Sequence, residues 1–242
     1  MMGKNSNQFL EAFVAIEEYL EQRNRSGRGM AFSQLVDNLR QQHSTVRLYA
    51  EDLKAFARLR NVIVHERGGG KILAEPNDWA VTQICHIRDI LLQPPTVALF
   101  SQRKVQSVMA SDSIARATRI MSQRHYSQLP VFDEHNYIGL LTTRNITYWL
   151  GTHHTDEVPL GQIPVSEVLA KSEPGDSAIF IANDTLLTEA LELFDYHERR
   201  QRYVDALLIT TDGTALSPLL GIIAVGDIPQ IYEVLNRHTG SA

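Results

Sequence analysis

Two similar eight-residue stretches carry the side chains best placed to bind a ligand. Residues 139–146 read GLLTTRNI and residues 221–228 read GIIAVGDI. Each has a Gly, two aliphatic residues, a short turn, and then Asn145 or Asp227 before an Ile. We interpret each as a buried strand that ends where a helix begins, with Asn145 and Asp227 positioned as capping acceptors. Because the first backbone N–H groups of a helix are exposed at such a junction, phosphates and sugars bind there readily.

A second group of candidate residues lies in LRNVIVHE, residues 59–66. An imidazole with a pKa near neutrality can move a proton to or from a ribose 2′-hydroxyl, and a guanidinium can stabilise charge on a phosphate. On a helix Asn61 and His65 share a face, whereas Arg60 lies about 140° around the axis from His65. The alternative is structural: His65 would stabilise the C-terminal end of the helix dipole, and Arg60 would form a hydrogen bond across a dimer.

Other residues with possible chemistry are weaker candidates. His153 and His154 are adjacent, but no further ligands have metal-site spacing, so we expect no metal and interpret the pair as part of a loop. Gly68–Gly70 lacks the Lys-Ser/Thr of a phosphate-binding P-loop and is interpreted as a turn. Trp79 and Trp149 occupy largely apolar helical positions, for which we expect core packing.

Composition narrows the classes of protein that need to be considered. The chain has 242 residues, a length sufficient for one or two domains with their own cores, and its net charge is −5. Residues 1–97 carry 12 Lys and Arg against 11 Asp and Glu, and residues 98–242 carry 11 against 17. Neither part is basic enough to indicate a nucleic-acid-binding domain. A single cysteine, no apolar signal segment and no run of 18 apolar residues predict a cytoplasmic protein without disulfides or a membrane span.

The elements that position these residues fall into two parts. Residues 1–93 are predicted to form a helical domain of about four helices, over 7–23, 32–41, 45–65 and 79–92. Residues 94–100 form a linker, because consecutive prolines favour a stiff extended segment.

The rest of the chain contains an internal repeat. Each copy is predicted to have a strand, a helix, a strand, a turn, a strand and a helix. The matched pairs are Val105–Met109 with Val165–Leu169 as first strands, Ser113–Ser122 with Thr185–Phe194 as helices, and Gln128–Phe132 with Ala206–Thr210 as second strands. The copies occupy 101–155 and 156–238, and the second has two insertions, one around 170–182 and the other around 196–205 together with 214–219. We expect the copies to pack on each other, because neither buries its apolar face alone.

The repeated region resembles a tandem pair of CBS domains, a Bateman module. The resemblance covers residues 101–238 and rests on V-x-x-V-M, D-S-I-A-R-A, D-T-L-L-T-E-A, L-P-V-F-D and the two G-h-h-x-x-x-[ND]-I ends. It implies two β-α-β-β-α units that form a pseudo-symmetric pair and usually dimerise into a disk. It also implies a regulatory role, with an adenine nucleotide (AMP, ADP, ATP or S-adenosylmethionine) as regulatory ligand and no required cofactor.

The family consensus, G-h-h-[TS]-x-x-D, assigns roles to residues of the first copy. Its hydroxyl contacts phosphate and its Asp holds both ribose hydroxyls. By resemblance Thr142 supplies the hydroxyl, whereas Asn145 replaces the Asp and loses the charge-assisted hydrogen bonds of a carboxylate. Thr143 and Arg144 add a hydroxyl and a cation near any phosphate. The residues of the first copy thus favour recognition of a phosphate-bearing ligand.

The second copy departs from the consensus in the opposite way. Ala224 replaces the hydroxyl, whereas Asp227 keeps the ribose acceptor. Gly226 would let the backbone approach the ligand closely. Ribose recognition therefore favours the second copy, and we expect one working site rather than two.

The Arg60 and His65 spacing resembles the R-x4-H motif of HEPN domains, which are small, usually dimeric helical bundles. In ribonuclease members, this motif from two protomers forms one metal-independent cleavage site, and Arg60, Asn61 and His65 would be those residues here. Many HEPN-like domains are instead dimerisation or ligand modules, and the near-neutral charge of this region argues against tight RNA binding.

The sequence therefore predicts an α+β protein, with an N-terminal HEPN-like helical bundle followed by a tandem pair of β-α-β-β-α CBS domains. The leading functional hypothesis is a homodimeric regulator in which adenine-nucleotide binding acts on the helical domain. One alternative is an endoribonuclease controlled by its CBS pair, and another is a structural dimer scaffold with degenerate sites.

Overall fold

The computed structural model describes residues 3–24, 29–64, 74–102, 104–152, 158–171, 178–199 and 204–236. The chain forms two compact units. The first unit contains Met1–Pro95 together with Leu186–Glu192 and Pro229–Ala242, and the second contains Thr96–Thr185 and Leu193–Ile228. Two segments from the C-terminal part of the sequence therefore belong to the first unit.

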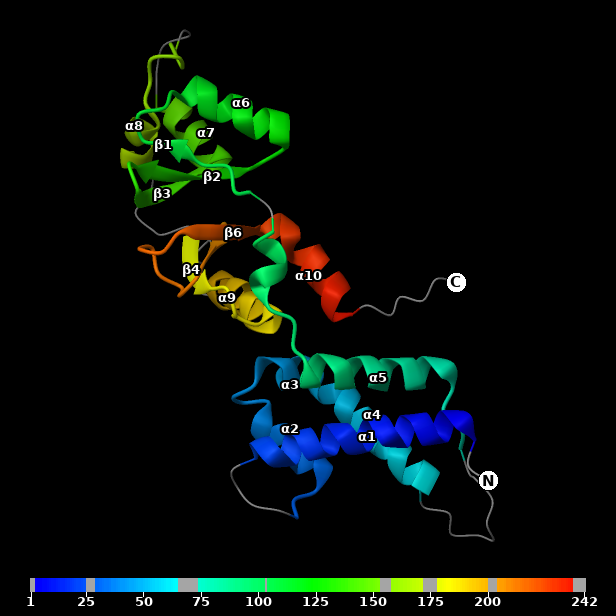
Figure 1. Cartoon of the computed structure of the whole chain (residues 1–242). Helices are drawn as coiled ribbons and strands as arrows, with labels where there is room; N and C mark the ends of the chain where they lie inside the picture. The colour runs from blue at the N-terminus through cyan, green and yellow to red at the C-terminus, as the bar shows by residue number, and fades with distance from the viewer. Residues whose placement is uncertain are drawn as a thin grey trace. The chain divides into compact units, whose positions relative to one another are not determined.

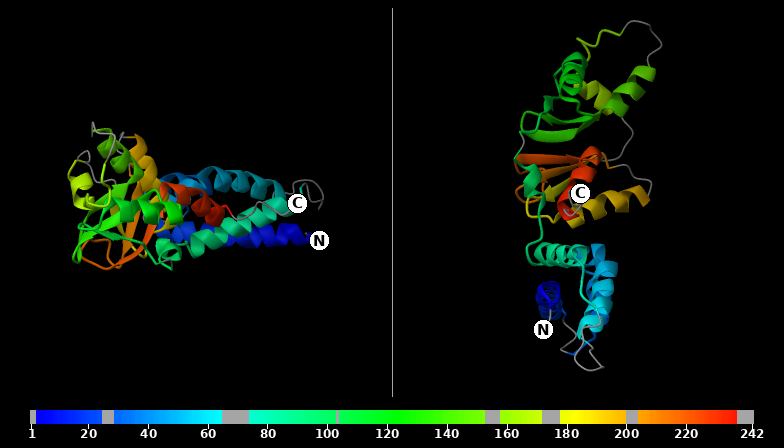
Figure 2. Two further views of the ribbon diagram at one scale, coloured as in Figure 1. Left: turned by 90° about the horizontal axis from the view of Figure 1, so that it is seen from above. Right: turned by 90° about the vertical axis from the view of Figure 1, so that its right-hand side faces the viewer.

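Helices build the N-terminal part of the first unit (Figures 1 and 2). Within the described residues they are α1 (Lys4–Arg23), α2 (Phe32–Leu39), α3 (Ser44–Leu48), α4 (Ala50–Val64) and α5 (Asp78–Leu92). Phe9, Phe13, Ile16 and Leu20 recur at helical spacing along α1 and are all buried, which places them on one face. The Phe9 ring meets Phe56 of α4 edge to face, with centroids 5.7 Å apart. The prediction of a helical N-terminal part is confirmed.

The single helix predicted over residues 45–65 is wrong, because the structure has two helices there. The chain leaves helical geometry at Tyr49, whose φ and ψ are −100° and 12°. Its side chain is buried, with 4% of its surface exposed. A new helix, α4, then begins with Glu51 and Asp52 in its first turn, where carboxylates interact favourably with the helix dipole.

The two tryptophans have opposite environments. Trp149 is fully buried, as predicted, whereas Trp79 is 63% exposed and the prediction of core packing is wrong for it. The face of α5 that is buried contains Ala80, Val81, Ile84 and, further along, Ile87, Ile90 and Leu91. Trp79 precedes this face by one residue, which turns its side chain outward.

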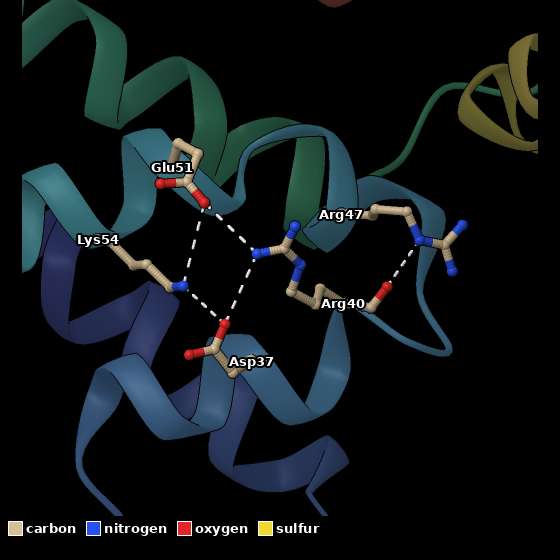
Figure 3. A network of polar contacts seen from close by, with 5 residues as sticks. All are labelled: Asp37, Arg40, Arg47, Glu51 and Lys54. Carbon is tan, nitrogen blue, oxygen red and sulfur yellow. Dashed lines mark hydrogen bonds and ion pairs between the residues drawn. The ribbon is translucent and has the colours of Figure 1, made fainter.

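A polar network links α2 to the beginning of α4 (Figure 3). Lys54 Nζ lies 2.6 Å from Asp37 Oδ1, and Arg40 Nη1 lies 3.4 Å from Glu51 Oε1 and 3.6 Å from Asp37 Oδ1. Arg47 Nε donates to the Arg40 carbonyl oxygen at 2.7 Å. The hydrogen bond from Lys54 and, more weakly, the charges of Lys54 and Arg40 hold the pKa of Asp37 below its ordinary value.

We expect Lys54→Met to remove a pH-dependent part of the stability. A carboxyl group with a lowered pKa in the folded state stabilises the fold above its ordinary pKa, and this contribution is lost as the pH falls through the lowered pKa. The melting temperature of the variant should thus lie below that of the wild type near neutral pH, and the difference should shrink in acid. Melting curves across this range test it, with the exposed Lys104→Met as control. An equal difference in melting temperature at neutral and at acid pH would contradict this prediction.

Two three-stranded sheets form the core of the second unit, and both have the same topology. The first contains β1 (Val108–Met109), β2 (Gln128–Asp133) and β3 (Asn136–Thr142), and the second contains β4 (Ala178–Ala182), β5 (Ala206–Thr210) and β6 (Leu219–Ala224). In each sheet the first strand runs parallel to the second, which pairs with the third in antiparallel register. This repetition confirms the predicted duplication. The accompanying helices are α6 (Ile114–Arg124), α7 (Thr143–Gly151), α9 (Leu187–Arg199) and α10 (Ile228–Leu235), with 3-10 helices η1 (Val97–Phe100) and η2 (Val225–Asp227).

The strand predicted at Val165–Leu169 is wrong. This segment forms α8 (Val165–Ala170), which follows Pro164 and buries Val165 and Val168. Both side chains join the core of the first sheet with Val108, Leu129 and Trp149. The strand that corresponds to β1 is β4, within a segment that the sequence comparison assigned to an insertion. A V-x-x-V spacing fits a helix face as well as a strand, so pairing with β5 decides between them.

The two sheets pack on each other within the second unit, as predicted from the repeat. Leu140 of β3 forms one buried cluster with Ala178 of β4 and with Ala206 and Leu208 of β5. At its edge the Tyr137 ring meets Phe180 at 88°, with centroids 5.0 Å apart. Small residues on β4 and β5 thus let the sheets approach closely.

Gly221 is required by a close approach of the backbone. A Cβ atom at this position would lie 2.8 Å from the carbonyl oxygen of Phe100 and 3.0 Å from Ser101 Cα. Both neighbours are backbone atoms at the end of η1, so they cannot turn aside as a side chain could. The first residue of the second motif therefore fixes η1 against β6.

Candidate functional site

The first predicted strand-to-helix junction is confirmed at Thr142, where β3 ends and α7 begins. Thr142 is the N-cap residue, and its Oγ1 accepts a hydrogen bond from the Asn145 backbone N–H at 3.0 Å. Asn145 Oδ1 accepts in return from the Thr142 backbone N–H at 2.9 Å. The two form a capping box, so Asn145 occupies the third helical position and Thr142, not Asn145, is the cap.

Hydrogen bonds within the junction occupy the groups that were predicted to bind a ligand. The Thr142 hydroxyl donates to Asn145 Oδ1 at 2.6 Å, and Thr142 is only 4% exposed. Asn145 Oδ1 therefore accepts two hydrogen bonds inside the loop, which uses both of its lone pairs. Its Nδ2 can only donate. The first junction offers no side-chain acceptor at Asn145 for a ribose hydroxyl.

The Arg144 side chain, which was predicted to lie near a phosphate, forms an ion pair with Asp205. Its Nη2 lies 2.8 Å from Asp205 Oδ2, and the two side chains are 54% and 27% exposed. Asp205 directly precedes β5, and its carbonyl oxygen accepts from Gln128 Nε2 at 3.4 Å. The neighbouring Thr143 is exposed. Sequence reasoning missed Asp205, although the strand pairing makes it the counterpart of Ser127 in the first copy.

The second junction has the same backbone link with a different side-chain set. Asp227 Oδ2 accepts from the Ala224 backbone N–H at 2.8 Å, as Asn145 does from Thr142. Ala224 supplies no hydroxyl. Asp227 Oδ1 has no hydrogen bond to any residue that the structure describes, and the side chain is partly exposed. The fold therefore fixes one carboxylate oxygen, and the other has no hydrogen-bond partner among the described residues.

Gly226 lies in η2 beside this carboxylate and is exposed. A Cβ atom at this position would meet nothing within 4 Å. Packing within the fold does not require glycine here, which leaves ligand approach as the role predicted for it.

The residues of the R-x4-H pattern are only partly within the described residues. Arg60 and Asn61 lie near the end of α4, whereas His65 lies outside them, as do Gly68–Gly70 and the His153–His154 pair. The Arg60 guanidinium lies 5.8 Å from the centroid of the Phe13 ring. Its Nη1 donates to Asn61 Oδ1 at 3.4 Å. The ribonuclease hypothesis stays a prediction.

Two further properties bear on the class of site. The described residues contain no group of three or more His, Cys, Asp or Glu side chains arranged to hold a metal ion. None of the described helices has the length and apolar character needed to cross a bilayer.

The comparisons with known proteins concern the repeated region. The family model for the CBS domain matches residues 97–151. The CBS domain-containing protein YhcV of Bacillus subtilis is 28% identical over 141 residues, which are 57% of this chain and 86% of that protein. Together with the repeated sheet topology, these matches support a tandem pair of CBS domains. Asn145 lies in the first CBS domain and Asp227 in the second.

Solved structures also match the CBS pair. A protein from Vibrio cholerae named for acetoin utilization (AcuB) is 16% identical, with a TM-score of 0.46, and the match covers 60% of this chain and 94% of that one. The CBS domain pair of protein MJ0100, in complex with 5′-methylthioadenosine and S-adenosyl-L-methionine, is also 16% identical, with a TM-score of 0.43 and coverages of 57% and 96%.

Proposed function

We propose that this protein is a regulator whose second CBS domain binds an adenosine-containing ligand through Asp227. The CBS match supports a regulatory role, and the proposal concerns which ligand the protein senses. One observation carries the proposal: Oδ2 of Asp227 accepts from the Ala224 N–H, while Oδ1 accepts no hydrogen bond from the described residues. A carboxylate oriented in this way can accept hydrogen bonds from ribose hydroxyls without further ordering, which lowers the cost of binding.

The first CBS domain is the weaker site in this proposal. Its hydroxyl and its amide oxygen bond to each other, and its cation is paired with Asp205. A phosphate would have to displace the Asp205 carboxylate from Arg144 before it could bind there. Of the residues predicted to bind a ligand at this junction, Thr142, Arg144 and Asn145 thus already have partners within the fold, whereas Thr143 is exposed.

Calorimetric titration of the full chain with adenosine, AMP, ADP, ATP and S-adenosylmethionine tests the proposal. We expect one ligand per chain and a similar ribose-dependent contribution for every compound in this series. The 2′-deoxy form of the ligand that binds best should bind more weakly, because Asp227 would lose one hydroxyl partner. Absence of binding by all five compounds up to millimolar concentration would reject the proposal.

Asp205→Asn is expected to strengthen the binding of phosphate-bearing ligands and to leave adenosine binding unchanged. The substitution removes the charge that pairs with Arg144, and because such exposed pairs contribute only about 0–1 kcal/mol, we expect a gain of up to about fivefold for AMP over adenosine. Titration of both compounds measures it.

The matched control is Asp184→Asn, which removes the same charge from an exposed residue of the same domain. Equal gains in AMP affinity for the two variants would indicate a general effect of net charge, and the role assigned to Arg144 would be wrong.

A further inference from the structure

Two helices of the second CBS domain belong in part to the first unit. The first unit contains Leu186–Glu192, which includes the start of α9, and Pro229–Ala242, which includes nearly all of α10. By contrast, α7, which follows the first junction, lies entirely in the second unit. The two CBS domains are therefore not equivalent in their connection to the N-terminal helices.

The start of α9 is held by a cluster of buried hydroxyl groups. Thr188 Oγ1 lies 2.7 Å from Ser44 Oγ and 3.1 Å from Thr45 Oγ1, and the three residues are 6% exposed or less. Buried hydroxyls without partners cost free energy, so each member of this cluster depends on the others. An ion pair between Arg47 and Glu192 lies one turn further along α9.

Two side chains from the N-terminal part of the first unit contact the Leu235 carbonyl oxygen at the end of α10. The Leu235 carbonyl accepts a hydrogen bond from the Tyr49 hydroxyl at 2.5 Å, and His86 Nε2 of α5 also contacts it. The last carbonyls of a helix lack partners within the helix, so side chains from elsewhere can bind them. Burial, and secondarily the Asp52 carboxylate, raise the pKa of Tyr49, which keeps its hydroxyl protonated as a donor.

The binding residue and this anchor lie at opposite ends of the same short helix. Asp227 directly precedes α10, and Leu235 is its last residue. A helix of eight residues is a stiff rod about 12 Å long. A movement at Asp227 therefore displaces the Leu235 carbonyl rather than being absorbed between them.

We propose that α10 couples the Asp227 site of the second CBS domain to the helical unit, and that the first CBS domain lacks this connection. The part of the proposal that concerns ligands rests on the proposed function. The coupling itself has a ligand-free consequence, because substituting Asp227 also removes the hydrogen bond to the Ala224 N–H that fixes the start of α10.

Hydrogen–deuterium exchange of the full chain without ligand is the first test. Asp227→Ala should raise exchange about fivefold, the effect of losing one hydrogen bond, in α10 and around Tyr49. Asn145→Ala removes the equivalent bond in the first CBS domain and should raise exchange only near α7. Asp227→Asn keeps an acceptor and should behave as the wild type. Unchanged exchange in β5 and β6 shows that the second CBS domain remains folded.

The second test adds the adenosine compound that binds the wild type. Ligand should change exchange around Tyr49 in the wild type, and Tyr49→Phe should abolish this change while affinity stays within about twofold. Tyr19→Phe is the matched control, because Tyr19 lies on α1 and its hydroxyl has no hydrogen bond to the described residues.

Two results would overturn the coupling: Asp227→Ala and Asn145→Ala affecting exchange around Tyr49 equally, or neither affecting it. Binding without any change in the helical unit would also overturn it and would leave the proposed function intact. If no adenosine compound binds, the proposed function fails, and the ligand-free comparison still decides whether α10 couples the two regions.

Discussion

Asp227→Ala is expected to weaken the binding of an adenosine ligand by about 30- to 100-fold, because hydrogen bonds between the ribose hydroxyls and a charged acceptor are lost. The carboxylate is the only side chain of the second junction that combines a fixed orientation with an open acceptor among the described residues. Isothermal calorimetry of the variant and the wild type at equal protein concentration measures the loss.

Two matched variants separate ribose recognition from damage to the fold. Asp227→Asn keeps the hydrogen bond to the Ala224 N–H but removes the charge, so it should retain the melting temperature and still lose most of the affinity. Asn145→Ala removes the equivalent side chain from the first CBS domain and should leave the affinity within about twofold. A larger loss for Asn145→Ala than for Asp227→Ala would assign the ligand to the first CBS domain.

Gly221→Ala is expected to give the largest loss of stability among substitutions in the two motifs. The added methyl group would meet the Phe100 carbonyl oxygen at 2.8 Å, so η1 or β6 has to move. Overpacking of this kind costs about 1–3 kcal/mol. For a chain of this size, the corresponding fall in melting temperature is about 3–10 °C.

Gly226→Ala is the control for this prediction, since it changes the same residue type five positions later in the motif. Its methyl group meets nothing within 4 Å, and Gly226 lies in a helical turn. Stability should stay the same or rise slightly, because alanine restricts the unfolded chain. If Gly226→Ala nevertheless weakens ligand binding, the backbone at Gly226 contacts the ligand. A fall in stability equal to that of Gly221→Ala would contradict the steric argument.

The elements that could be predicted from the sequence are those whose local pattern has one meaning. The pattern of a Gly, two aliphatic residues and a polar turn predicted both strand-to-helix junctions. Apolar residues at helical spacing predicted α1. The strand at Val165–Leu169 was wrong because V-x-x-V fits either element, and pairing of β4 with β5 settles the choice. Long-range pairing decides such cases, and a single sequence does not contain it.

The candidate site follows the same division. Asn145 and Asp227 could be singled out because they recur at equivalent positions of the repeat. Asp205 could not be singled out, because its partner Arg144 is 61 residues away in the sequence and lies in the other CBS domain. Nor does the sequence show that the Thr142 hydroxyl is already used by Asn145, since that depends on the geometry of the capping box.

The hydroxyl cluster at Ser44, Thr45 and Thr188 has a consequence for how this region responds to water. An apolar contact that opens exposes surface that water cannot bind, so its opening is costly in proportion to area. Hydroxyl groups instead find hydrogen-bond partners in water as soon as they separate, and the net contribution of each such bond is only about 1 kcal/mol. Hydration therefore compensates much of the polar contact between α9 and the N-terminal helices when it opens. This part of the contact can form and break with little net change in free energy.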